Sequence, residues 1–198
     1  MPRKSRIEYP GATYHILNRG NYRKALFEQE PTGRAFEASV YEVSERCGWH
    51  LYAYVVMTNH YHLCVHTPEA NLVAGMQWLQ GTFATRFNRF RGESGHVFQG
   101  RYKAIVVKGR DYLSRLIDYI HLNPVRAGIC DLNSLRYFEP SSYAKFWTKE
   151  IPEPLKREIV TGLHGLPNSI KGMKSYVEHL AASEARDPQN RKALSKKF

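Results

Sequence analysis

Apolar residues along the first half of the chain recur with the spacings of strands and helices. The segment from Thr13 to Asn18 is short and β-prone, and Arg19-Gly20-Asn21 after it favours a turn. Between Pro31 and Gly48, apolar side chains recur at steps of four and three residues. This spacing predicts a core-facing helix that the glycine ends, with an apolar face made by Phe36, Val40, Val43 and Cys47.

A hairpin and a second helix are predicted next. Two strand-like runs, Trp49 to Met57 and His60 to His66, are separated only by Thr58-Asn59, which predicts that they pair as a β-hairpin. From Asn71, a candidate N-cap, apolar residues mark one face of a helix. We interpret this stripe as core: Leu72, Met76, Leu79, Phe83, Phe87 and Phe90.

The next segment changes from helix to strand and back. The pattern breaks at Gly92 to Gly95, and residues 97–107 resemble a strand that carries Arg101 and Lys103 on the same side. Asp111 is then a candidate cap for a helix whose core face includes Leu113, Leu116, Ile117 and Ile120. This helix is expected to end near Pro124, because proline disfavours helical conformation in the residue before it.

The predicted order is β, α, β, β, α, β, α. That order matches an α+β, ferredoxin-like or RRM-like fold, in which helices pack on an antiparallel sheet. After Gly128, prolines interrupt short helical pieces, and the segment from Asn190 to Phe198 carries four basic residues. We therefore expect a domain over residues 1–130 and a C-terminal helical extension with a basic tail over residues 131–198.

Composition narrows the class of partner. The chain has 198 residues, 29 Lys and Arg against 18 Asp and Glu, and a formal net charge of +11. Such a charge suits a polyanion, and because no apolar run is long enough to cross a bilayer, nucleic acid is favoured over lipid and a cytoplasmic location is expected. The cysteines Cys47, Cys64 and Cys130 lack the spacing of a disulfide framework or zinc knuckle.

Positive charge is concentrated between Gly81 and Arg126, which hold nine basic and three acidic side chains. A charged run is usually a solvated face. These residues, however, come from predicted helix, strand and turn segments that would converge around one site. Such a cluster of positive charge favours phosphate binding.

His60 and His62 lie on the same face of a predicted strand. Successive side chains of a strand alternate between faces, so Tyr61 points away and the two imidazoles start from Cα atoms about 7 Å apart. That spacing allows both to bind one cation. Histidines on the solvated face of a sheet fit the pattern equally well.

The helix from Asp111 to Asn123 carries polar residues beside its apolar face. At about 100° per residue, Tyr112, Tyr119 and Asn123 fall within about 40° of one another. A tyrosine at such a border is more often a packing residue than a nucleophile.

Together these segments resemble a known family. His60-Tyr61-His62 resembles the HUH signature (histidine, bulky apolar residue, histidine), and Asp118 to Gly128 resembles the catalytic-tyrosine helix of the IS200-like Y1 transposases. The REP-associated tyrosine transposases are the most similar branch. The order of the motifs distinguishes this chain from relaxases of the same superfamily. In relaxases the tyrosine precedes the histidine pair, whereas here it follows.

The resemblance implies a metal-dependent Y1 HUH transposase, a single-strand DNA endonuclease and strand transferase. It implies that His60, His62 and Asn123 bind Mg²⁺ or Mn²⁺, and that Tyr119 attacks the phosphate of single-stranded hairpin DNA to form a 5′-phosphotyrosine. Tyr112 is the rival nucleophile. The expected phosphate contacts are Arg101, Lys103 and Arg126, followed by Arg86 and Arg89, and a monomer is favoured over a dimer.

The other histidines, Cys64 and two alternative functions fit the sequence less well. His15 and His121 are expected to pack or face solvent, and Cys64 to be structural, because a thiolate is a poor ligand for a hard cation. A non-catalytic module that binds single-stranded nucleic acid is the alternative function, with Tyr52, Tyr54 and Tyr61 stacking on bases. A zinc hydrolase is disfavoured, because no third His, Cys or carboxylate stands at ligand spacing.

Overall fold

The computed structural model describes residues 7–186. Its first seven main elements follow the predicted order: β1 (Ala12–Arg19), α1 (Glu30–Cys47), β2 (His50–Val56), β3 (His60–Thr67), α2 (Leu72–Arg91), β4 (Lys103–Val106) and α3 (Arg110–Arg126). A short 3₁₀ turn, η1 (Asn21–Arg23), follows β1. None of the helices within 7–186 has the length and apolar character needed to cross a bilayer.

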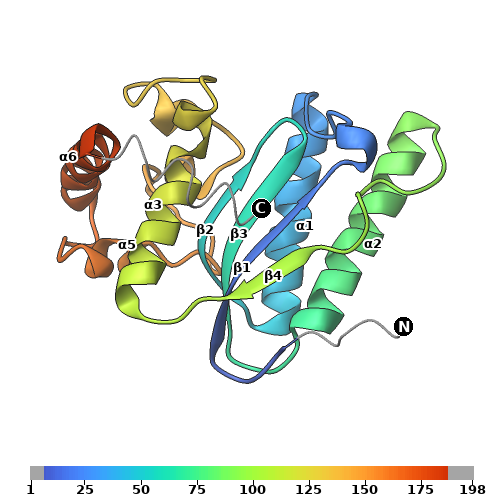
Figure 1. The fold of residues 1–198 in the computed structure, drawn as a ribbon, viewed down its shortest axis with the longest axis horizontal. Coiled ribbons are helices and arrows are strands. Elements are labelled where there is room, and N and C mark those ends of the chain that lie inside the picture. Colours follow the sequence, from blue (N-terminus) through green and yellow to red (C-terminus); the bar gives the residue numbers. More distant parts are fainter. Residues whose placement is uncertain (1–6, 187–198) are drawn as a thin grey trace.

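The four strands form one antiparallel sheet in the order β2-β3-β1-β4. Helices α1 and α2 lie on one side of it and α3 on the other (Figure 1). This arrangement confirms the α+β, ferredoxin-like fold, with β1 in the centre between β3 and β4.

The pleat of β3 divides its side chains between the two helical layers. Tyr61 packs on the α1 side, where its ring centroid lies 4.5 Å from that of Phe36. His62 faces α3, and its ring centroid lies 5.5 Å from that of Tyr119. The predicted alternation is therefore confirmed, and it directs the histidine pair toward the helix that carries the tyrosine.

Strand β4 is shorter than predicted. It covers Lys103–Val106 rather than residues 97–107, and before it only an isolated bridge joins Phe98 to Gly20. Gly100 has a φ of 69°, in the left-handed region that interrupts an extended run. Arg101 therefore lies in the irregular segment before the strand.

Helix α3 continues past its expected end. Pro124 lies inside it and Arg126 is its last residue. The ring removes one N–H donor, but the final turn keeps hydrogen bonds from Ala127 N to Asn123 O at 2.9 Å and from Ile129 N to Pro124 O at 3.0 Å. At the other end Gly109 is the N-cap, so Asp111 lies in the first turn and does not cap the helix.

Of two details predicted for α2, one is confirmed and one is wrong. Asn71 is the N-cap residue as predicted, although its side chain makes no cap bond. It accepts a hydrogen bond from Trp49 Nε1 at 2.7 Å and donates one to the carbonyl of Cys47 at 2.9 Å, so it joins α2 to the end of α1. Phe90 is 60% exposed and does not belong to the core.

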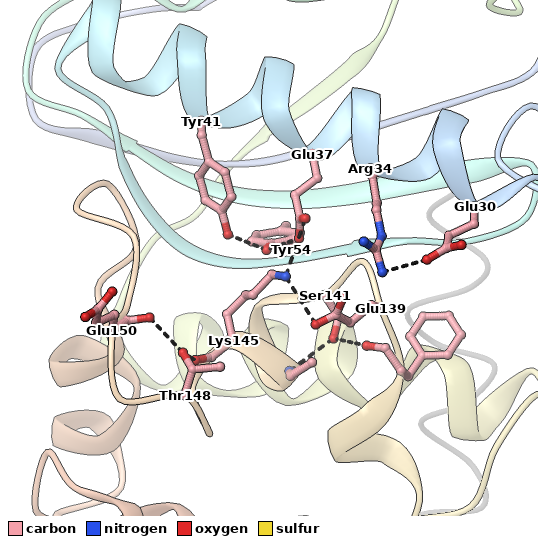
Figure 2. Close-up of polar contacts among 12 residues, drawn as sticks. Glu30, Arg34, Glu37, Tyr41, Tyr54, Glu139, Ser141, Lys145, Thr148 and Glu150 are labelled. Carbon is pink, nitrogen blue, oxygen red and sulfur yellow. Dashed lines mark hydrogen bonds and ion pairs between the residues drawn. The ribbon is translucent and has the colours of Figure 1, made fainter.

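The C-terminal part forms short helical segments and one helix as long as α3: η2 (Leu135–Tyr137), α4 (Ser142–Lys145), α5 (Arg157–Leu163) and α6 (Ile170–Arg186). A polar cluster joins α4 to the domain (Figure 2). Tyr54 Oη of β2 donates to Glu37 of α1 at 2.6 Å, and Lys145 Nζ lies 3.6 Å from the same carboxylate. The basic segment from Asn190 to Phe198 lies outside the described residues.

Candidate active site

A cavity of about 560 Å³ opens at the α3 side of the sheet. Strands β1 and β3, the segment before β4, and α3 all contribute to it. The lining residues are Leu17, Asn18, Arg19, Arg23, Asn59, His60, His62, Gln99, Arg101, Lys103 and Tyr119. Both motifs singled out in the sequence therefore meet at one cavity with a basic rim.

His60 and His62 present neutral imidazoles to this cavity. Their ring centroids lie 5.2 Å apart with planes nearly perpendicular, at 89°. His62 is 3% exposed, and burial lowers its pKa well below the usual range, with the neighbouring His15 and His60 adding to the effect. Burial likewise lowers the pKa of His60. The rings are therefore uncharged at neutral pH, the form that binds a cation.

Asn123 links the histidine pair to the tyrosine. Its side chain hydrogen-bonds with both His60 and Tyr119. On α3 Asn123 follows Tyr119 by four residues, so the two side chains are neighbours on one helical face. Asn123 is 9% exposed, so the protein fixes its amide in place.

The Tyr119 phenol lies in a partly buried position with a cation close by. Burial raises its pKa, while the hydrogen bond with Asn123 and the charge of Arg126 act in the opposite direction. The guanidinium carbon of Arg126 lies 5.9 Å from the centre of the tyrosine ring. Tyr112, two turns earlier on α3, does not line the cavity.

Known proteins place this site in a family. The model of the family described as "Transposase IS200 like" matches residues 8–123. This chain belongs to the IS200-like transposase family. The match contains β1, β3 and the first fourteen residues of α3, and it ends at Asn123. Membership makes the protein a transposase, and so a DNA-cleaving enzyme.

A solved structure agrees with the fold of this transposase. A REP-associated tyrosine transposase bound to a REP hairpin is similar at a TM-score of 0.61 and 17% identity, over 78% of this chain and 90% of that chain. A protein described as a transposase from Deinococcus radiodurans aligns at a TM-score of 0.43 and 19% identity, over 60% of this chain and 95% of that one. No curated protein sequence matches.

The basic residues of the transposase converge only in part. Arg101 and Lys103 line the cavity. Arg126 lies at Tyr119 and forms an ion pair with Glu184 of α6 at 2.9 Å. Arg86 instead pairs with Glu42 at 3.1 Å on the α1 and α2 side of the sheet, and Arg89 lies on the same helix as Arg86, outside the cavity lining. The expectation of one common site is therefore wrong for Arg86.

Sequence reasoning missed His15, which lies against His62 outside the cavity lining, and three residues of the lining itself. His15 Nε2 lies 3.0 Å from His62 Nδ1, and the two rings stack with centroids 5.2 Å apart. Arg19, Arg23 and Gln99 also line the wall, and the Arg19 side chain hydrogen-bonds with Gln99. The period-two pattern of β1 puts His15 and Leu17 on one face, but the pairing of Leu17 with His62 is a long-range property.

Cys64, His66 and His121 have structural positions. Cys64 is fully buried, and burial raises the pKa of its thiol, as expected for a core residue. His66 stacks on Tyr52, with the ring planes 9° apart. His121 is buried between Tyr176 Oη at 3.0 Å and Ser142 Oγ at 2.9 Å, which confirms a packing position.

A separate group of side chains has the spacing of a metal site. Asp118 of α3, His164 after α5 and His179 of α6 offer ligand atoms that all lie within 4.8 Å of one another. Sequence reasoning missed this group, because its members are far apart along the chain and His164 and His179 lie outside the motif that Asp118 begins. It faces the C-terminal helices and shares no residue with the cavity lining.

Proposed function

We propose that this transposase cleaves and rejoins single-stranded hairpin DNA through a covalent bond to Tyr119. The observation that carries the proposal is the meeting of Tyr119, His60 and His62 at one cavity with a basic rim, where Asn123 hydrogen-bonds with both Tyr119 and His60. The solved relative that is bound to a REP hairpin supports DNA of this kind as the substrate.

Mg²⁺ or Mn²⁺ is the proposed cofactor at His60, His62 and Asn123. The donor set fits such an ion, because burial keeps both imidazoles neutral and the Asn123 amide lies within hydrogen-bond contact of His60. Two imidazole nitrogens favour Mn²⁺ over Mg²⁺. When bound, the cation would polarise the scissile phosphate and offset its developing charge.

Tyr119 is the proposed nucleophile. Its Oη forms a bond to phosphorus while the bond from phosphorus to the 3′-oxygen breaks, so the phenol loses a proton and the 3′-oxygen gains one. The product is a 5′-phosphotyrosine and a free 3′-OH, and attack by another 3′-OH reverses the step. Burial raises the phenol pKa and so disfavours the charged phenolate. Asn123 and Arg126 act in the opposite direction, and they would stabilise the negative charge that develops on Oη.

The cavity rim is the proposed phosphate contact. Arg101 and Lys103 approach from the β4 side and Arg19 and Arg23 from the end of β1, so cations surround the entrance. We assign catalysis to residues 1–130 and assign residues 131–198 to the extension. A monomer is the proposed active species, since His62 and Tyr119 of the same chain already lie together, with ring centroids 5.5 Å apart.

The alternative, a non-catalytic module, loses its structural basis. Tyr52, Tyr54 and Tyr61 were its proposed base-stacking residues, yet all three are buried. Helices cover both faces of the sheet, so these rings cannot stack on bases without unfolding.

The decisive experiment detects the covalent intermediate. Purified protein is incubated with 3′-end-labelled single-stranded hairpin DNA and Mn²⁺, so that the label stays on the fragment joined to Tyr119, and is then separated under denaturing conditions. The labelled adduct should form with wild type and with the control Tyr112→Phe, and be absent with Tyr119→Phe. An adduct that persists in Tyr119→Phe, or its absence from wild type across a library of hairpins that the protein binds, would refute the proposal.

A further inference from the structure

We propose that Asp118, His164 and His179 form a second metal site, which holds a Zn²⁺-class cation and fastens the C-terminal helices to the helix that carries Tyr119. Helices α5 and α6 lie on the side of α3 away from the sheet (Figure 1). The proposal does not depend on the cleavage mechanism, because no member of the group lines the cavity.

The distances between the ligand atoms fit a single small cation. His179 Nε2 lies 2.9 Å from Asp118 Oδ2, and His164 Nε2 lies 3.3 Å from Asp118 Oδ1. Ligands about 2.0–2.2 Å from a tetrahedral Zn²⁺ stand roughly 3.3–3.5 Å from one another. Small movements of the side chains are therefore enough to place a cation between them.

The identity of the donors selects the kind of metal. Two imidazole nitrogens and one carboxylate are three protein ligands of a Zn²⁺ site, which leaves a fourth position for water. Mg²⁺ and Ca²⁺ prefer sites made of oxygen ligands. A soft cation such as Cu⁺ prefers thiolates and thioethers, and no sulfur belongs to this group.

The Asp118 carboxylate is held by contacts to both of its oxygens. His164 contacts Oδ1 and His179 contacts Oδ2. Tyr176 Oη donates to Asp118 Oδ1 at 2.7 Å, and it also contacts His121 Nδ1. These contacts orient the carboxylate, as outer hydrogen bonds do at metal sites.

The buried negative charge of Asp118 also favours a bound cation. The Asp118 side chain is 8% exposed, and its ion-pair partners within residues 7–186 are the two histidines, which are charged only when protonated. A buried carboxylate is costly without a positive partner. A divalent cation would be a further positive partner for this carboxylate, and the 43% exposed side chain of His179 places one ligand at the protein surface.

Metal content and a spectroscopic probe test the site. The full-length protein is stripped with chelator, reloaded with Zn²⁺ and desalted, and its metal is counted by mass spectrometry. Co²⁺ titration then reports tetrahedral coordination through visible ligand-field bands. We expect one tightly bound equivalent in wild type, which persists in His60→Ala/His62→Ala and in the exposed-histidine control His96→Gln, but is lost in His179→Gln and Asp118→Asn.

Stability provides a second measurement. Zn²⁺ should raise the Tm of wild type and leave the Tm of His179→Gln unchanged, because a cation that binds only the folded state stabilises it. Tyr176→Phe removes an outer hydrogen bond and should weaken Zn²⁺ binding by about 10–100-fold.

Three results would overturn the proposal. Wild type that retains no Zn²⁺ and develops no Co²⁺ bands would show that the group is only a hydrogen-bonded contact. Binding that disappears in His60→Ala/His62→Ala but not in His179→Gln would place the metal at the cavity instead. Binding that depends on His96 would show that it is adventitious. Because His179 is partly exposed, its substitution is the variant least expected to unfold the chain.

Discussion

Helix α3 has two polar faces with different properties. One carries Tyr119 and Asn123 toward the cavity, beside the neutral imidazoles of His60 and His62. The other carries Asp118 and His121 toward the C-terminal helices, where Tyr176 hydrogen-bonds with both. We call the first the cavity face and the second the anchor face.

The two faces differ in their expected roles. We expect the cavity face to take part in DNA chemistry and the anchor face to hold α3 in place. A hydrogen-bonded network in a buried setting fixes side chains and backbone, as on the anchor face. The phosphate site proposed for the cavity face instead needs open positions and nearby cations. Substitutions on the cavity face should therefore affect DNA chemistry more than stability, and those on the anchor face the reverse.

The largest expected effect separates the two groups of histidines. His62→Ala should lower the rate of hairpin cleavage in Mn²⁺ by about 10³-fold, because a bound cation contributes several kcal/mol to charge stabilisation. His164→Gln should lower it by less than about tenfold at a temperature where both variants are folded. Cleavage rates measured in single turnover test the contrast, which fails if His164→Gln is the slower enzyme.

Asn123→Ala examines the cavity face within α3 itself. Tyr119 loses its hydrogen-bond partner, and the misplaced phenol should slow cleavage by about 10²-fold. The free energy of unfolding should change by about 1 kcal/mol. Single-turnover cleavage and urea unfolding are measured together, and a loss of stability large enough to explain the slow cleavage would remove Asn123 from the cavity face.

Asp118→Asn examines the anchor face at the neighbouring position. It removes a charge that accepts hydrogen bonds from Tyr176, His164 and His179, so the free energy of unfolding should fall by about 2 kcal/mol. Urea unfolding with chelator present isolates this effect from metal binding. An unchanged midpoint would mean that the carboxylate does not hold α3 in place.

Acid should weaken the anchor face through His121. Burial lowers its pKa from 6.5 to about 3, so the unfolded chain binds a proton between these pH values and the folded chain does not. Stability is therefore lost as pH falls from 6.5 toward 3, by about 1.4 kcal/mol per pH unit from this one group. In chelator, His121→Gln should flatten the dependence of unfolding free energy on pH between 6 and 4, and an unchanged slope would contradict the prediction.

Local sequence patterns were enough to predict most of the framework. The alternation in β3 correctly placed His60 and His62 opposite Tyr61, and the glycine after Cys47 correctly marked the end of α1. The same reasoning failed at Pro124, where propensity disfavoured a helix but the hydrogen bonds of the last turn maintain it. Propensity is a weak guide wherever such contacts compensate.

Long-range contacts were beyond the sequence patterns. The pairing of β1 with β3 brings His15 to His62, and the packing of α6 on α3 brings His179 to Asp118. Neither pairing has a local signature, because side chains about 47 or 61 residues apart meet only after the chain has folded. The tyrosine and histidine motifs could be recognised in the sequence, whereas the residues that contact them after folding, such as His15 and His179, could not.

The smallest expected effect compares basic residues on opposite sides of the sheet. Arg101→Ala should weaken hairpin binding and reduce the slope of log affinity against log salt by about 1, as expected for the loss of one phosphate contact. Arg86→Ala should leave both unchanged, because Arg86 is paired with Glu42 beyond the opposite face. Binding is measured by anisotropy with Tyr119→Phe as the background, so that cleavage does not deplete the DNA. If the two variants lose equal hairpin affinity, the DNA also contacts α2, and the predicted difference between the two sides of the sheet is wrong.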